Sequence, residues 1–319
     1  MNYIIFDLEW NQGVSHGEKR DKKTPLEIVE IGAVKLNEDR EMIGEFSELI
    51  KPQIYHEMHN ITRKIIHIQM EELEKGKPFE EVMPAFLDWC GEDSLFCTWG
   101  TLDLLELQRN MEYYNMKPLS DKPIKYYDIQ KLFSLAYEDG KSRRSLEFAI
   151  DMLSIKKDIP FHRAFSDAYY TAKVFDKIED PDVLEKYSFD TYVVPTSLED
   201  EINITFNDYS KIITTTYSDK RNLLDEKRYN TPVCYKCKKR VSKRLKWFSP
   251  NGRHYYFVGY CLRHGYMKSK IRIRKAENGG TYAVITNKLI TKEQKKELIQ
   301  KRDEFLQKKK ENTLKKVGV

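Results

Sequence analysis

The first half of the sequence predicts an α/β fold in which a mixed β-sheet is flanked by helices. Three apolar runs, at residues 3–9, 28–36 and 43–50, are joined by short connections, which is typical of an antiparallel meander. After them, helix-period segments alternate with strand-like ones, as expected when helices cover both faces of a sheet. The chain has 319 residues, of which 40% are hydrophobic. That is enough for one ample core and a second, smaller domain.

The remaining elements of this domain follow from their periodicity. Residues 79–89 and 164–178 each carry apolar side chains at helical spacing on one face, so we expect two amphipathic helices. Between them we expect, in order, a buried strand, a helix, a strand and a helix, at residues 95–99, 104–114, 126–129 and 145–153.

We expect three parts in the chain: a first domain at 1–190, a linker at 191–229, and a basic β-rich domain at 230–319. The linker prediction comes from polar, irregular sequence with a Thr run at 214–216. The third part should end in a helix, because Thr291 and Gln294 have the spacing of a capping box before an apolar-periodic segment.

The net charge of +5 hides a strong asymmetry. Residues 221–319 hold 28 Lys and Arg against 8 Asp and Glu, which is a net charge of +20, so the remainder carries −15. A basic appendage on an acidic body indicates a polyanionic partner, although a solvated basic surface that only confers solubility is the alternative.

The cysteine count and the hydropathy pattern predict a cytoplasmic protein. Five cysteines is an odd number, and three of them have metal-ligand spacing, which fits a reducing compartment better than a disulfide framework. No apolar stretch is long enough for a membrane span, and the N-terminus lacks the basic region of a signal peptide. We therefore expect no membrane partner.

Acidic residues recur at positions where a sheet could gather them. Asp7 and Glu9 are two residues apart on the first strand, so both side chains point to one face. Asp103 follows a buried strand, and His162 stands just before the helix that contains Asp167. Paired carboxylates repel unless a hard cation such as Mg²⁺ binds them. Taken singly, each residue has an ordinary structural alternative, such as a helix N-terminal acid.

Together these residues resemble the DEDDh branch of the DnaQ-like 3′→5′ exonuclease superfamily. The resemblance covers roughly residues 1–180: FDLE with Asp7 and Glu9, then Asp103, then H-x₄-D with His162 and Asp167, with EIVEIGAVKL as the second strand. The Eri-1-like and KapD-like group of RNA-trimming exonucleases is the most similar. The resemblance implies an RNase H-like fold and release of nucleoside 5′-monophosphates from single-stranded nucleic acid, with RNA preferred.

The resemblance also implies roles for the site residues. Asp7, Glu9, Asp103 and Asp167 would hold two Mg²⁺ or Mn²⁺ ions, with Asp7 bridging them, and His162 would be the general base. A DNA-trimming exonuclease remains an alternative. A nucleic-acid-binding regulator with weak or no catalysis is another. The oligomeric state stays open.

Two further residues are expected near the terminal nucleotide. The segment around Thr62 resembles the one that lies beside it in the family. Trp10 departs from the small or hydroxyl residue common after Glu9, so it either stacks on the terminal base or belongs to the core.

Cys234, Cys237, Cys261 and His264 form C-x₂-C and C-x₂-H pairs separated by 23 residues. This spacing predicts one structural Zn²⁺ with three sulfur ligands and one nitrogen ligand, which would stabilise a small domain with little core. The alternatives are two unrelated pairs, or His254 in place of His264.

Basic and aromatic residues surround this metal-ligand pattern. Basic residues can bind phosphates and aromatic faces can stack on bases, so we expect nucleic-acid contacts here, although aromatics in a small domain also build its core. The expected contacts are Lys238, Lys239, Arg240, Lys243, Arg244 and Trp247.

Overall fold

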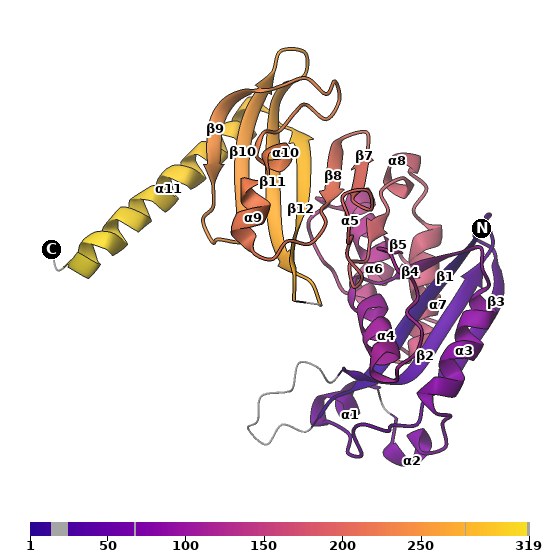
Figure 1. Cartoon of the computed structure of the whole chain (residues 1–319). Helices are drawn as coiled ribbons and strands as arrows, with labels where there is room; N and C mark the ends of the chain where they lie inside the picture. Colours follow the sequence, from indigo (N-terminus) through magenta and orange to yellow (C-terminus); the bar gives the residue numbers. More distant parts are fainter. Residues whose placement is uncertain (14–24, 67, 278, 318–319) are drawn as a thin grey trace. The chain divides into compact units, whose positions relative to one another are not determined.

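The computed structural model describes residues 1–13, 25–66, 68–277 and 279–317, with side chains described up to residue 312. These residues form two compact units, Met1–Asp190 and Thr191–Val319, each with its own sheet (Figure 1). No helix in the described ranges combines the length and the apolar character that a membrane span requires.

The first unit is built on a six-stranded mixed sheet in the order β3-β2-β1-β4-β5-β6. The strands β1 (Asn2–Asn11), β2 (Glu27–Leu36) and β3 (Met42–Leu49) are the expected antiparallel meander. β4 (Ser94–Thr98) and β5 (Lys125–Asp128) continue the sheet in parallel with β1, and β6 (Ser188–Phe189) closes it antiparallel to β5. The predicted mixed α/β sheet is therefore confirmed.

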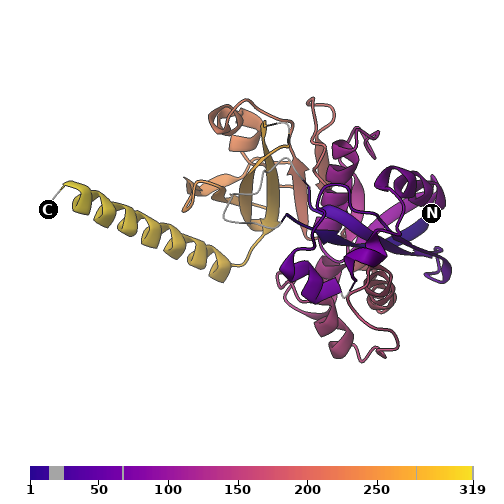
Figure 2. The same ribbon diagram turned by 90° about the horizontal axis from the view of Figure 1, so that it is seen from below.

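Helices cover both faces of this sheet because side chains alternate along β1 (Figure 2). Ile4, Phe6 and Leu8 pack with α3 (Phe79–Cys90) and α4 (Leu102–Tyr113). Ile5 points the opposite way, into the cluster formed with α5 (Ile129–Tyr137), α6 (Leu146–Met152) and α7 (Ala164–Asp176). Asp7 and Glu9 have the parity of Ile5, so they lie on the face that α7 covers.

Three short helices complete the first unit. They were not expected from the sequence, because none of them is longer than seven residues and periodicity needs a longer window. They are α1 (Asn60–Ile66), α2 (Met70–Leu73) and α8 (Pro181–Leu184).

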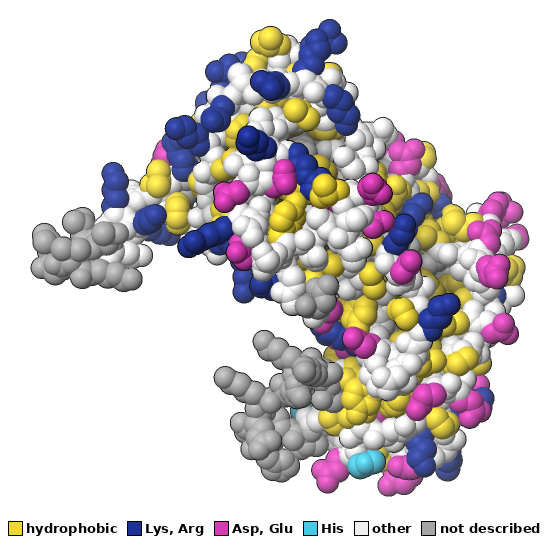
Figure 3. Space-filling view, viewed as in Figure 1, with side chains coloured by type: hydrophobic (Ala, Val, Ile, Leu, Met, Phe, Trp, Pro, Cys, Tyr) yellow, Lys and Arg dark blue, Asp and Glu magenta, His cyan; other side chains and the backbone are white. Residues whose placement is uncertain are grey.

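The second unit is an antiparallel sheet in the order β7-β8-β12-β11-β10-β9. Its strands are β7 (Ile202–Thr205), β8 (Tyr209–Ile213), β9 (Ser242–Phe248), β10 (His254–Cys261), β11 (Gly265–Lys275) and β12 (Thr281–Leu289). Two short helices, α9 (Lys220–Asp225) and α10 (Lys227–Asn230), contribute Leu223 and Tyr229 to the core on one face. The predicted small β-rich basic unit is confirmed, and Lys and Arg side chains gather over it in the view of Figure 3.

The linker predicted at 191–229 is wrong. This segment contributes β7 and β8, and β8 pairs with β12 from Tyr209 to Ile213. The strands are only four and five residues long and carry Thr and Asn, so the sequence resembles a polar connector. β7 pairs with β8, but the other partner of β8 is β12, some 75 residues further along the chain, where local patterns cannot reveal it.

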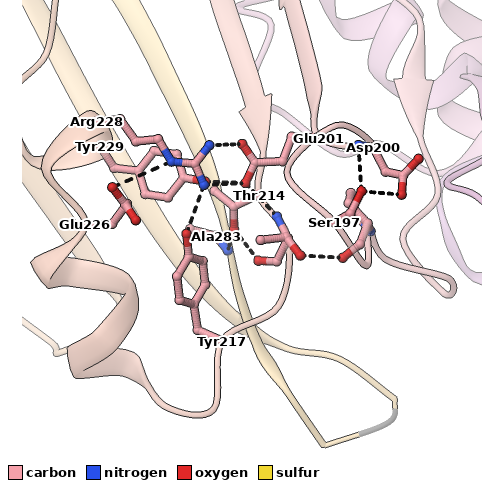
Figure 4. Close-up of polar contacts among 11 residues, drawn as sticks. Ser197, Asp200, Glu201, Thr214, Tyr217, Glu226, Arg228, Tyr229 and Ala283 are labelled. Atoms are coloured by element: carbon pink, nitrogen blue, oxygen red, sulfur yellow. Dashed lines mark hydrogen bonds and ion pairs between the residues drawn. The ribbon is translucent and has the colours of Figure 1, made fainter.

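Glu201 anchors this segment to the rest of the second unit (Figure 4). Its buried carboxylate accepts hydrogen bonds from both terminal nitrogens of Arg228, at 2.8 and 3.1 Å, and from the backbone N–H of Thr215 at 2.9 Å. The Tyr229 hydroxyl donates to the same carboxylate, and Arg228 also donates to the Tyr217 hydroxyl. The carboxylate therefore joins the start of the unit to α10.

The chain ends in α11 (Lys292–Val317), a 26-residue helix that begins at the expected capping box. The Thr291 hydroxyl accepts from the Gln294 backbone N–H at 3.2 Å, and the Gln294 side chain accepts from the Thr291 N–H at 3.1 Å. The C-terminal helix is thus confirmed.

Candidate functional site

Asp7 and Glu9 project from the C-terminal half of β1 toward α7. Asp7 lies opposite Gly32 of β2 and Glu9 lies opposite Glu30, and the register shifts immediately after Glu9. Both side chains are half-buried. The period of the strand therefore places two carboxylates side by side, as the sequence predicts.

Gly32 allows α7 to reach these carboxylates. A Cβ atom added at Gly32 would lie 1.9 Å from the backbone nitrogen of Phe165, far inside any permissible contact. Only glycine therefore lets the first turn of α7 rest on β2 directly beside Asp7. That turn contains Asp167, one of whose carboxylate oxygens lies within 4.8 Å of oxygens of Asp7 and Glu9.

An ion pair fixes the loop that precedes α7. The Glu30 carboxylate, which is 1% exposed, accepts from Nε of Arg163 at 3.0 Å and from a terminal nitrogen of Arg163 at 2.7 Å. It also accepts from the backbone N–H of Ala164 at 3.2 Å, and so it satisfies the first turn of a helix that has no side-chain N-cap of its own. Glu30 therefore holds the start of α7 on the sheet.

His162 is the residue immediately before this clamp. Its backbone has φ +66°, a left-handed conformation that costs energy in a residue other than glycine. The imidazole is exposed, and its charge and backbone lower the pKa of Asp167, which shows that His162 lies against the carboxylate group. The clamp at Arg163 and the helix after it hold this strained turn in place.

Asp103 enters from the opposite side of the sheet, in the first turn of α4. It is 5% exposed, and hydrogen bonds from backbone N–H groups, including that of Leu8, stabilise its carboxylate. Asp103 is outside the tight group formed by Asp7, Glu9 and Asp167. Its charge still acts on Asp7, where it is the strongest cause of a raised pKa after burial.

Burial, and to a lesser degree neighbouring negative charges, make the four carboxyl groups hard to ionise. Burial raises the pKa of Glu9 to about 8, with a further contribution from Asp167. Burial raises the pKa of Asp103 to about 7 and that of Asp167 to about 6, and it raises the pKa of Asp7 well above its ordinary range. Such a cluster is stable with all its carboxylates charged only if positive charge is supplied.

The donor set fits divalent cations that prefer oxygen. All four side chains offer carboxylate oxygens, which suit Mg²⁺ or Mn²⁺. Oδ1 of Asp167 is buried and has no hydrogen-bond partner among the described residues, although a buried carboxylate oxygen normally has one. A cation at this point would satisfy that oxygen.

The second unit contains a separate cluster of possible metal ligands. Nδ1 of His264 lies 3.5 Å from Sγ of Cys234 and 3.7 Å from Sγ of Cys261, and Sγ of Cys237 lies 3.6 Å from Sγ of Cys261. All four atoms are within 4.8 Å of one another. Ligands about 2.3 Å from a tetrahedral zinc ion are spaced at about 3.7 Å, so these atoms fit Zn²⁺.

Backbone N–H groups prepare these thiols for a metal. Burial opposes ionisation of Cys261, but N–H groups of Arg263 and His264 point at its sulfur and lower its pKa to about 6. Burial raises the pKa of Cys234, and the N–H groups of Cys237 and Lys236 offset part of that rise. The turn after Cys237 places Lys238 at φ +58°, and Lys238 N–H donates to the Cys234 carbonyl at 2.7 Å.

Trp247, one of the expected nucleic-acid contacts, is half-buried. Trp247 packs into the core of the second unit, 5.3 Å from Phe257 between ring centres, and its indole N–H donates to the Asn230 carbonyl at 3.0 Å. The basic residues expected beside it are all exposed: Lys238, Lys239, Arg240, Lys243 and Arg244.

The two residues expected near a terminal nucleotide are placed differently from each other. Thr62 is 6% exposed, and its hydroxyl donates to the Trp10 carbonyl at 3.4 Å. Trp10 is half-buried and packs against the core on the α3 and α4 face. The two residues are therefore neighbours on one wall beside Glu9.

Sequence reasoning missed three residues that build the site: Glu30, Gly32 and Arg163. Gly32 inside an apolar strand was a usable signal, because a strand glycine often marks a close approach of another backbone. The ion pair had no comparable signal, because 133 residues separate its partners.

Comparison with known proteins gives one family match. The family described as "Exonuclease" (RNase_T) matches residues 4–175, which contain all five of the acidic and histidine site residues. No curated protein matches the chain.

Several solved structures are similar to part of the chain. The nuclease domain of 3′hExo, a DEDDh family member bound to rAMP, is 19% identical with a TM-score of 0.47, over 55% of this chain and 90% of that one. A full-length 3′-exonuclease is 18% identical with a TM-score of 0.47, over 55% and 80% of the two chains. E. coli exonuclease I with a dA16 oligonucleotide is 13% identical with a TM-score of 0.49, over 85% and 54%.

Proposed function

The chain belongs to the exonuclease family and is a 3′→5′ exonuclease of the DEDDh superfamily, and from this premise we propose that it hydrolyses single-stranded nucleic acid, with RNA as the preferred substrate. The observation that carries the proposal is the group formed by Asp7, Glu9 and Asp167, with Asp103 acting on Asp7 and His162 beside Asp167. The products are nucleoside 5′-monophosphates.

In this proposal the four carboxylates would hold two divalent cations, Mg²⁺ or Mn²⁺, which would supply the positive charge that an in-line phosphodiester displacement needs at its attacking and leaving oxygens. His162, exposed at the mouth of the site, accepts the proton of the attacking water. Glu30 and Arg163 keep that imidazole over the carboxylates. The buried surroundings of Asp103 keep water away from one side of the site.

The test is the shortening of oligonucleotides in the presence of Mn²⁺. A 5′-labelled single strand should shorten one nucleotide at a time from its 3′ end, and Asp7→Asn should abolish this reaction. Asp39→Asn is the matched control, because Asp39 is exposed in the turn between β2 and β3. Equal cleavage by wild type and Asp7→Asn would overturn the assignment.

Matched RNA and DNA oligomers separate the two candidate substrates, because they differ only in the 2′-hydroxyl. Faster shortening of the RNA oligomer is expected. A clear preference for DNA would leave the exonuclease assignment intact and refute the RNA proposal.

We also propose that Cys234, Cys237, Cys261 and His264 hold one structural Zn²⁺, since all four ligand positions come from the protein. The purified chain should contain one equivalent of zinc by elemental analysis, and Cys237→Ala should lose it and destabilise the second unit. Cys90→Ala removes another buried cysteine as a control. Full zinc content in Cys237→Ala would refute the site.

A further inference from the structure

The second sheet carries a row of cations on one face of β11. Strand alternation puts Lys268, Lys270, Arg272 and Arg274 on the same side, at intervals of about 7 Å. Ile271 and Ile273, which alternate with them, belong to the core that Leu223 and Tyr229 complete on the other face. The row is therefore a fixed feature of a rigid strand.

The neighbouring strands do not neutralise Lys270, Arg272 or Arg274. Lys270 pairs with Tyr256 and Thr286, and Arg272 pairs with His254 and Val284. An acidic residue at one of these cross-strand positions would have stabilised the sheet. Within the described part of the chain, no Asp or Glu forms an ion pair with Lys270, Arg272 or Arg274.

Like charges in this face crowd one another. The pKa of Lys270 is lowered by burial and then by the charges of Arg272 and Lys301. The pKa of Arg272 is lowered by burial and then by the charge of Arg274. His254 of β10, which lies opposite Arg272, has its pKa lowered by burial and then by Lys270 and Arg272. A polyanion on this face would relieve the repulsion.

Aromatic rings and further cations border the row. Tyr256 and Tyr260 of β10 lie on the same side of the sheet as Lys270 and Lys268. Nζ of Lys301 lies 4.8 Å from the Tyr256 ring centre, and the Arg244 guanidinium lies 5.4 Å from that of Tyr260. The first turns of α11 thus add positive charge beside the strand.

We propose that this face, formed by Lys268, Lys270, Arg272 and Arg274 with Tyr256 and Tyr260, binds the backbone of a single-stranded nucleic acid. The inference rests on the proposed function and names where the second unit holds the substrate. A straight row of cations at regular spacing suits the repeating phosphates of an extended strand, and two arginine forks suit phosphate oxygens. Phenol rings beside the row suit unpaired bases.

The test is the salt dependence of binding by the full-length protein, with a 5′-labelled single strand and without Mg²⁺ or Mn²⁺. Each lost phosphate contact should reduce the slope of log Kd against log salt by about 0.7. The variant K270A/R272A/R274A should therefore lose about 2 from the slope and bind about 100-fold more weakly at 0.1 M salt. The control K75A/K156A/K177A removes three exposed lysines of the first unit and should change neither value.

Two further measurements keep this inference separate from the proposed function. Hydrolysis of a dinucleotide, whose single phosphodiester cannot follow a row of cations, should be equal in wild type and in the triple variant. If wild type does not hydrolyse dinucleotides or longer strands, the proposed function fails whatever the binding result. Because the variant removes mutual repulsion, its melting temperature should be unchanged or higher, and K270Q/R272Q provides a milder second variant.

Three outcomes would overturn the inference. The first is wild-type affinity and slope in the triple variant. The second is a K238A/K239A/R240A variant that loses the whole slope while the triple variant keeps it. The third is a triple variant that no longer binds phosphatidylserine vesicles but still binds the single strand. That result would assign the face to a membrane surface.

Discussion

The free energy of unfolding of the metal-free protein should fall as the pH rises, because the folded state buries its acidic site at least cost when the carboxyl groups are protonated. The pKa of Glu9 rises from 4.5 to about 8 in the folded chain. The folded state therefore binds more protons than the unfolded chain between these values, and stability falls as pH increases through them. That rise in pKa corresponds to about 5 kcal/mol, of which about 4 kcal/mol lies between pH 5 and pH 8.5.

Urea denaturation at pH 5 and at pH 8.5, with the protein dialysed free of Mg²⁺ and Mn²⁺ but with zinc content verified, measures this loss. Adding Mg²⁺ should restore stability at pH 8.5, because the cation binds the folded carboxylates and not the unfolded chain. Glu9→Gln has no proton to lose and should show a smaller pH dependence than wild type. Equal pH dependence in Glu9→Gln and wild type, or no effect of Mg²⁺ at pH 8.5, would refute the reasoning.

Four other substitutions test how the site and the second unit are held together. Gly32→Ala should destabilise the protein by about 3 kcal/mol and lower kcat at least 100-fold, because its Cβ displaces α7 at Phe165; a wild-type melting temperature would contradict this. Glu30→Gln should lower kcat roughly 10- to 100-fold with little change in KM, and Arg163→Lys should not substitute for the bidentate pair; unchanged kcat and pH profile would show that the clamp does not position His162. Glu201→Gln should cost about 1–3 kcal/mol in urea denaturation of the second unit while dinucleotide hydrolysis continues; loss of hydrolysis would argue against separate units.

Features set by local periodicity could be predicted from the sequence. Asp7 and Glu9 share a face because a strand has a period of two, and the helix containing Asp167 shows its apolar stripe. The spacing of the cysteine and histidine pairs likewise predicted a metal-ligand cluster, and in the structure its sulfur and nitrogen atoms lie within 4.8 Å of one another. Each of these depends only on residues close in the chain.

Features set by pairing across the sheet could not be predicted. Asp7 stands beside Gly32 because of the register of β1 and β2, and that register decides where α7 can rest. Trp247 looked like a surface ring among lysines, yet beside a register shift between β9 and β10 it packs, half-buried, against the core. Binary patterning alone does not fix register or bulges.

The place of β8 at the interior of the second sheet decides where the chain can be divided. β8 pairs with β7 on one side and with β12 on the other. A fragment that ends just before Arg228 would lack β12, so one edge of β8 would have no hydrogen-bond partner. It would also lack Arg228, which leaves the Glu201 carboxylate without its ion pair. Cutting between Asp190 and Thr191 keeps each hydrogen-bonded sheet whole, so fragments for separate binding and cleavage experiments should begin and end there.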